Sequence, residues 1–100
     1  MKYSLSSADF KYVYSNSKSL LIQEIRYYYL KDQNPQLGFI VSRKYGNSVE
    51  RNLFKRRCRY KFYELIKNGF PYSIIIKPKA QKIDWNIIKS SLESLNAEIT

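Results

Sequence analysis

The residues of this chain that could do chemistry are gathered in one cationic run, from Arg43 to Lys61. Eight of its nineteen positions are Lys or Arg and one, Glu50, is acidic, so the run supplies +8 − 1 = +7 of a formal net charge of +10. The run also carries apolar residues at helical spacing, among them Phe54 and Cys58. A structured helix with this charge density is suited to binding a polyanion, and nucleic acid is the first candidate.

Catalytic or metal-binding side chains form no recognisable group in the sequence. The chain has no histidine, which removes the usual proton shuttle near neutral pH and the commonest zinc ligand. Its eight Asp and Glu residues are scattered, without the close pairing of a glycosidase or a two-metal site. Cys58 is the only cysteine, so an internal disulfide is impossible, which agrees with a reducing compartment. The sequence therefore predicts no catalytic residue and no metal site on the polypeptide.

A cationic run of this composition is also compatible with two roles that do not involve nucleic acid. Charge runs often form a solvated face that only keeps a protein in solution. A basic amphipathic helix can also be the target of a calmodulin-like partner. Charge alone, moreover, does not distinguish RNA from DNA as the polyanion.

A helical projection separates the charged and the apolar residues of the run. At about 100° per residue, the polar side chains from Arg51 onward fall between about 0° and 140°, whereas the apolar ones fall between about 300° and 20°. The polar set comprises Arg51, Asn52, Lys55, Arg56 and Arg59, and the apolar set comprises Phe54, Cys58, Phe62 and Leu65. The helix can therefore pack its apolar side while the guanidinium groups, which can each donate two hydrogen bonds to one phosphate, reach outward.

The rest of the chain supplies the elements that must position this helix. Residues at cap spacing mark the helix starts, Gly69 suits a helix end, and the polar segment 31–36 is typical of a hairpin turn. The expected elements are a helix capped by Ser6 or Ser7 and running through Ser15, strands at 20–30 and 37–43, a helix from near Val49 to Lys67 capped by Asn47 or Ser48, a strand at 72–76, and a helix at 83–99. In the last helix, Asp84 is the cap or a first-turn acid, and the buried stripe comprises Trp85, Ile88, Leu92 and Leu95. The order helix, strand, strand, helix, strand, helix predicts a mixed α/β domain.

Length and composition favour one domain that folds by itself. A hundred residues suffice for one core and not for two, so we expect a single domain over residues 1–100. The 44% of hydrophobic and 16% of aromatic residues argue against a disordered chain. No apolar run follows Lys2 as it would in a signal peptide, and none reaches the roughly 18 residues of a membrane helix. We therefore expect a soluble, cytoplasmic protein.

The cationic helix carries a motif that resembles the RNR signature of the protein subunit of bacterial ribonuclease P. The motif is G-N-S-V-E-R-N-L-F-K-R-R-C-R, and the family pattern is R-N-x-x-K-R-x-x-R after a strand that ends in V-S-[KR]-K-x-G. Every defined position is filled, by Arg51, Asn52, Lys55, Arg56 and Arg59 in the signature and by Val41, Ser42, Arg43, Lys44 and Gly46 before it. The resemblance continues in D-F-x-x-V-Y, which begins at Asp9, and in I-I-I-K-P, which begins at Ile74.

The resemblance implies both a fold and an activity. The family folds as a two-layer α/β (α+β) sandwich of three to four strands, like the second domain of ribosomal protein S5, with a left-handed strand-helix-strand crossover against the usual rule. In the family, a catalytic RNA with its Mg²⁺ ions removes the 5′ leader of precursor tRNA by endonucleolytic cleavage, and the protein is a non-catalytic subunit. The implied partners are that catalytic RNA and precursor tRNA, with no membrane, no DNA and no cofactor on the protein itself.

The resemblance also implies two RNA-binding sites. The catalytic RNA would bind Lys44, Arg51, Asn52, Lys55, Arg56 and Arg59. The leader would lie in a cleft between the first helix and the sheet, whose floor would include Phe10, Tyr14, Tyr28, Ser42 and Lys44. Bases of single-stranded RNA stack on aromatic rings whatever their sequence, which suits leaders of varied sequence. The residues alone favour a different interpretation, in which Phe10, Val13 and Tyr14 form the core side of the first helix.

An alternative function is a ribosomal or general RNA-binding module without a ribozyme partner, and a helical DNA-binding domain is a more distant one. Four residues also depart from the family pattern. Ser17 stands where glycine is common, Tyr60 and Lys61 stand where Glu or Gln and Ala are frequent, and Ser73 replaces an aspartate before the last strand. These four positions lie outside the signature.

Overall fold

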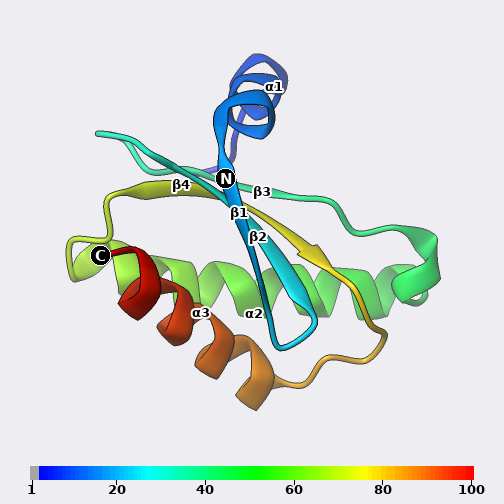
Figure 1. Ribbon diagram of the computed structural model, residues 1–100. Helices are drawn as coiled ribbons and strands as arrows, with labels where there is room; N and C mark the ends of the chain where they lie inside the picture. The colour runs from blue at the N-terminus through cyan, green and yellow to red at the C-terminus, as the bar shows by residue number, and fades with distance from the viewer. Residues whose placement is uncertain (1–2) are drawn as a thin grey trace.

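The computed structural model describes residues 3–100, which form three α-helices and one four-stranded sheet (Figure 1). The elements in chain order are α1 Ser7–Asn16, β1 Lys18–Ile22, β2 Ile25–Lys31, β3 Leu37–Phe39, a 3₁₀ turn Arg43–Tyr45, α2 Ser48–Lys67, β4 Tyr72–Pro78 and α3 Trp85–Ile99. The first two helices begin where the sequence predicts, and α3 begins at Trp85, two residues after the predicted start at residue 83. The side chains of Ser6, Asn47 and Asp84 each accept a hydrogen bond from an amide of the first turn.

The single strand predicted at 20–30 is wrong, because the chain reverses within it. Gln23 and Glu24 have positive φ angles of 49° and 66° and form a two-residue turn between β1 and β2. The two strands pair as an antiparallel hairpin, with Ile22 opposite Ile25. Sequence patterns did not predict this turn, because Gln and Glu seldom adopt positive φ and because β-prone residues flank them on both sides.

The hairpin predicted between β2 and β3 is also wrong. The sheet order is β1-β2-β4-β3, so β4 lies between the two, antiparallel to β2 and parallel to β3. The polar segment 31–36 is held to β4 instead. The amide of Asp32 donates to the carbonyl of Pro71 at 2.9 Å, and Ser73 Oγ donates to Asp32 Oδ2 at 2.9 Å while it accepts from the amide of Gln36 at 3.0 Å. β3 ends at Phe39, short of the predicted Arg43, which begins the 3₁₀ turn.

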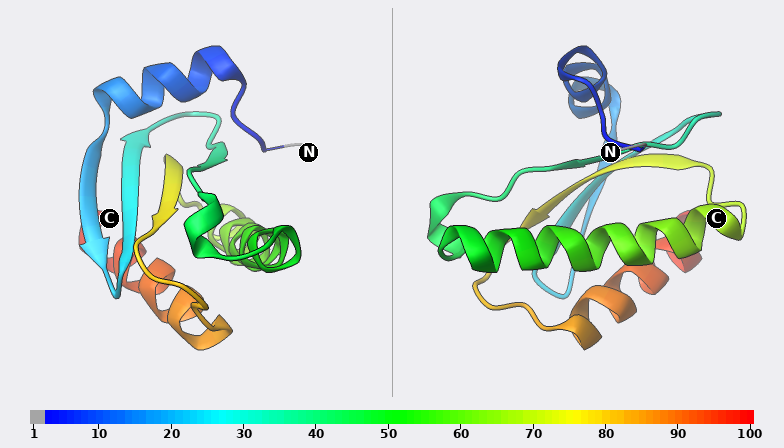
Figure 2. Two further views of the ribbon diagram at one scale, coloured as in Figure 1. Left: turned by 90° about the vertical axis from the view of Figure 1, so that its right-hand side faces the viewer. Right: turned by 180° about the vertical axis from the view of Figure 1, so that it is seen from behind.

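Helices lie on both faces of the sheet. α2 and α3 lie side by side against one face, and α1 crosses the other (Figure 1). With β3 and β4 pointing toward the viewer, the path from β3 through α2 to β4 turns clockwise (Figure 2, left), so the crossover is left-handed, as the resemblance implies. The two-layer α/β sandwich is thus confirmed, and α1 lies outside it on the opposite face of the sheet.

The hydrophobic core lies between the sheet and the layer of α2 and α3. The residues of β2 and β4 that point into it alternate along each strand, and they are Ile25, Tyr27, Ile74 and Ile76. The helices contribute Phe54, Cys58, Phe62 and Leu65 from α2 and Ile88, Leu92 and Leu95 from α3, as their spacing predicts. Trp85, the first residue of the predicted stripe, is only half-buried. Ser91 of α3 satisfies the buried hydroxyl of Tyr27, and burial raises the pKa of that hydroxyl.

α1 packs closely against the opposite face of the sheet. Val13 of α1 and Ile75 of β4 are buried on this face. A Cβ atom at Gly38 would lie 3.0 Å from Leu5 Cδ1 and 3.0 Å from Phe10 Cδ2. Residue 38 must therefore be glycine, or its neighbours must shift, for α1 to approach β3 this closely.

Candidate RNA-binding surfaces

Local hydrogen bonds hold the N-terminus of α2. Asn47 Oδ1 accepts a hydrogen bond from the amide of Glu50 at 2.9 Å, and Glu50 Oε1 accepts one from the amide of Asn47 at 3.0 Å, which completes a capping box. Arg51 Nη1 donates to the carbonyl of Gly46 at 2.7 Å. Arg51 therefore stabilises the loop before α2, in addition to its predicted role toward RNA.

The outer side of α2 presents the predicted signature residues. We call Arg51, Asn52, Lys55, Arg56 and Arg59 the cationic face of α2. Asn52 and Arg56 are exposed, and the other three are half-buried. Within residues 3–100, both ion pairs involve Lys61, so no carboxylate of this range pairs with a cation of this face. The four charges are therefore available to an external anion.

Arg59 connects the cationic face to the sheet. Its guanidinium carbon lies 5.6 Å from the centre of the Phe39 ring, in a cation–π contact. Its Nε is buried and has no hydrogen-bond partner among the described residues. The orientation of this guanidinium group therefore comes from packing against Phe39 on β3.

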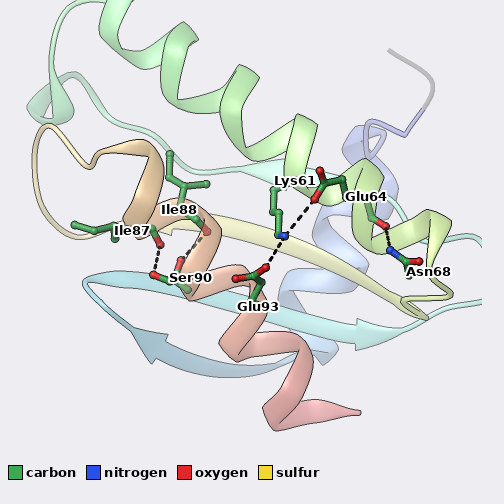
Figure 3. A network of polar contacts seen from close by, with 8 residues as sticks. Lys61, Glu64, Asn68, Ile87, Ile88, Ser90 and Glu93 are labelled. Carbon is green, nitrogen blue, oxygen red and sulfur yellow. Dashed lines mark hydrogen bonds and ion pairs between the residues drawn. The ribbon is translucent and has the colours of Figure 1, made fainter.

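Lys61 differs from the cations of the outer face. Its side chain is buried, and its Nζ lies 3.2 Å from Glu64 Oε1 and 3.0 Å from Glu93 Oε2 (Figure 3). Desolvation works to lower the pKa of Lys61, but the hydrogen bonds to Glu93 and Glu64 outweigh it and hold that pKa above its ordinary value. Lys61 therefore bridges α2 to α3, and its charge is neutralised within the protein.

Three aromatic residues predicted for the leader cleft lie together beside α1. Phe10 and Tyr14 stack with ring centres 6.3 Å apart, and the Tyr14 ring tilts against Tyr28 at 4.9 Å. Tyr14 is 47% exposed, whereas Phe10 and Tyr28 are half-buried. Partial burial, together with the neighbouring Tyr14 side chain, raises the pKa of Tyr28. The group leaves part of its ring surface open to a ligand.

The other two predicted cleft residues line a hollow near the end of the sheet. Ser42 and Lys44 are exposed, and they share a hollow of about 540 Å³ with Lys77 and Lys79. Sequence reasoning missed the latter two lysines. The sequence did contain a signal for Lys77. It follows Ile76, which is buried on the core side of β4, and strand alternation therefore directs the Lys77 side chain to the α1 side.

The register of the sheet relates the aromatic group to this hollow. Tyr28 is opposite Ile75, and two residues further along the same face Arg26 is opposite Lys77. Residues two apart on one strand are separated by about 6.6 Å. The aromatic group and the basic residues therefore occupy adjacent rows of one sheet face. Arg26 was also missed, although its alternation with buried Tyr27 pointed to this face.

Side chains for metal binding do not converge in the described structure. Among residues 3–100, no group of three or more His, Cys, Asp or Glu side chains could hold a metal ion. Cys58 is fully buried and burial raises the pKa of its thiol, so it is a poor ligand or nucleophile near neutral pH. No helix in the same range is long and apolar enough to cross a membrane.

Comparison with known proteins identifies the family. The ribonuclease P family model matches residues 3–100. The chain belongs to the ribonuclease P protein family. It is 35% identical over 94 residues to the ribonuclease P protein component of Thermoanaerobacter sp. (strain X514). That match covers 89% of this chain and 81% of the relative. The identity to the component of Listeria monocytogenes serotype 4b (strain CLIP80459) is 36% over 90 residues, which covers 84% of this chain and 76% of the relative.

Solved structures of ribonuclease P proteins share the fold. The Staphylococcus aureus RNase P protein superimposes with a TM-score of 0.80 at 27% identity, over 99% of this chain and 97% of that chain. The RNase P protein from Thermotoga maritima also superimposes with a TM-score of 0.80, at 23% identity and over 97% of both chains. This similarity establishes a common fold. The ribonuclease P assignment gives this chain a place in a ribonucleoprotein endoribonuclease that processes the 5′ end of tRNA, with an RNA as its partner.

Proposed function

We propose that this protein binds the ribonuclease P RNA through the cationic face of α2 and holds the 5′ leader of precursor tRNA against the α1 side of the sheet. The observation that carries the proposal is the presence of two surfaces of different chemistry. The cations of the first surface lack carboxylate partners within residues 3–100, and the second combines aromatic rings with a lysine-lined hollow. Lys44, between β3 and α2 in the chain, belongs to both sites.

On the first surface, binding would depend on phosphate neutralisation. The planar forks of Arg56 and Arg59 can each donate two hydrogen bonds to a phosphate, and Asn52 can bond to a base edge or a 2′-hydroxyl. The cations involved are Lys44, Arg51, Lys55, Arg56 and Arg59. If each neutralises one phosphate, the logarithm of affinity falls with the logarithm of salt concentration at a slope of about −3.5 to −4.5.

On the second surface, binding would depend on stacking and on the leader backbone. The rings of Tyr14, Tyr28 and Phe10 offer partners for exposed bases, a contact worth roughly 1–3 kcal/mol per base that does not require a given sequence. Lys44 and Lys77 would neutralise leader phosphates beside these rings.

In the proposal, cleavage is the chemistry of the RNA and its Mg²⁺ ions, while this chain binds and orients the substrate. Because bacterial precursor tRNA is made in the cytoplasm, the protein would act there.

Reconstitution with a bacterial ribonuclease P RNA tests the proposal. The protein should let the RNA remove the leader at a lower Mg²⁺ concentration, and it should favour precursor over mature tRNA. Identical cleavage with and without the protein, across a range of Mg²⁺ concentrations, would exclude the proposed function. A pull-down from cells separates it from the alternative, because a general RNA-binding module would return ribosomal RNA in place of one dominant ribonuclease P RNA.

A further inference from the structure

The outer side of α2 continues beyond the signature with aromatic residues. Arg56, Tyr60, Tyr63 and Lys67 are spaced at i, i+4, i+7 and i+11, which places them on one side of the helix. At about 100° per residue they lie within about 60° of one another, in line with Asn52 of the cationic face. The side of α2 that carries the signature therefore runs on for about two turns as two tyrosines between two cations. Tyr60 stands where the family pattern often has Glu or Gln.

Contacts with α3 hold the ring of Tyr60 in place. It lies edge to face with Trp85 at 5.8 Å between ring centres, with an interplanar angle of 68°. Lys89 Nζ lies 5.4 Å from the centre of the Trp85 ring. Despite these contacts, Tyr60 is 59% exposed. A fixed ring with an open surface costs little conformational entropy when a ligand stacks on it.

A hollow adjoins this ring along α2. Its volume is about 410 Å³, and its lining residues include Tyr60, Tyr63, Glu64 and Lys67. Glu64 is the acidic group of the lining, and its carboxylate is held 3.2 Å from the ammonium of Lys61. The acid is therefore partly neutralised by Lys61, and Lys67 adds a positive charge to the lining.

We propose that Tyr60, with Tyr63 beside it, binds an unpaired base of the ribonuclease P RNA, and that Arg56 and Lys67 bind the phosphates on either side. This inference rests on the proposed function, because it extends the same RNA contact along α2. Two observations favour RNA over a protein partner: the tyrosines continue a cationic face without carboxylate partners among residues 3–100, and cations flank them at both ends. Aromatic rings next to cations are the usual means of binding single-stranded nucleotides.

Two substitutions at Tyr60 test this site with a bacterial ribonuclease P RNA transcript. Tyr60→Leu removes the ring and keeps an apolar side chain, so affinity should fall about 5- to 150-fold, the equivalent of one lost stacking contact. The salt slope should not change, because no charge is lost. Tyr60→Phe retains the ring and should bind like the wild type. The matched control is Tyr12→Leu, because Tyr12 lies on α1 and its exposed fraction, 63%, is close to that of Tyr60. This variant should bind the RNA like the wild type.

A second measurement uses Trp85, the only tryptophan of the chain. A base stacked on Tyr60 would lie close to this indole, so the RNA should quench its fluorescence in the wild type and in Tyr60→Phe. Absence of quenching in a wild-type complex would overturn the inference even if Tyr60→Leu failed to fold. Equal affinities of the wild type and a folded Tyr60→Leu would also overturn it. If the wild type binds no ribonuclease P RNA at all, the proposed function itself fails.

Discussion

The two sides of helix α2 hold their cations in opposite ways. On the inner side, Lys61 is buried and paired with Glu64 and Glu93, so its charge is used to join α2 to α3. On the outer side, Arg56 and its neighbours meet no carboxylate among residues 3–100. The difference indicates that Arg56 contributes little to folding and is available to a ligand, whereas Arg51 also holds the loop before α2. Stability and RNA binding should therefore respond to different substitutions on the same helix.

The largest effect is expected from the apolar part of the inner side. Phe62 is fully buried and lies edge to face with Phe70 at 6.3 Å between ring centres. Phe62→Ala should lower the free energy of unfolding by about 3–5 kcal/mol, because it removes the packing of a whole ring and leaves a cavity. Urea unfolding measures this as a lower midpoint with an unchanged slope. A loss below about 1 kcal/mol would mean that the inner side of α2 is not part of the main core.

Removing one charge from the outer side should change RNA binding instead of stability. Arg56 is exposed and has no ion pair in the described structure. Arg56→Ala should weaken binding to ribonuclease P RNA by about 1.5–3 kcal/mol, the value of a charged hydrogen bond, and reduce the salt slope by about 0.7–0.9. The free energy of unfolding should stay within about 0.5 kcal/mol of the wild type. Filter binding over a range of salt concentrations and urea unfolding give the two quantities.

Two controls sharpen this test. Lys11→Ala removes an exposed charge from α1 and should leave binding to the ribonuclease P RNA unchanged. Arg51→Ala should affect both quantities, because Arg51 Nη1 also donates to the carbonyl of Gly46 at 2.7 Å. If Arg56→Ala destabilised the fold as much as Arg51→Ala, the outer cations would be structural, and the contrast between the two sides of α2 would be wrong.

The aromatic group beside α1 should contribute to the leader and not to the ribonuclease P RNA. Tyr14 is 47% exposed, and its ring lies between Phe10 and Tyr28. Tyr14→Leu in the reconstituted enzyme should weaken binding of precursor tRNA by about 1–3 kcal/mol and leave binding of mature tRNA unchanged. The measurement is the ratio of the two dissociation constants. Equal losses for both tRNAs would show that this surface does not contact the leader.

The parts of this structure that sequence patterns predicted are those determined within one element. The caps at Ser6, Asn47 and Asp84 depend on residues three positions away, and the two sides of α2 follow from its helical period. The signature residues lie on that single helix. Their common face could therefore be predicted without knowing how α2 packs on the sheet.

The parts that were missed depend on contacts between distant segments. The position of β4 between β2 and β3 is tied to hydrogen bonds of Ser73 with Asp32 and Gln36, which no local pattern contains. The basic row of Arg26 and Lys77 exists only because the register of β2 and β4 places them opposite each other. For the same reason, the sequence alone did not relate these two residues to the aromatic group at Tyr28.

The smallest effect is expected at Lys61 itself. Its partners Glu64 and Glu93 are 47% and 62% exposed, so solvent screens the pair, and Lys61→Met should change the free energy of unfolding by less than about 1 kcal/mol at pH 7. The pKa of Lys61 is raised in the fold, so its contribution is complete below its ordinary value of 10.5 and is lost as the pH rises through the folded value. The difference between wild type and variant in urea unfolding should therefore shrink above about pH 10.5. The salt slope of RNA binding should not change, because this charge faces inward. A fall in slope equal to that of Arg56→Ala would show that both sides of α2 contact the RNA.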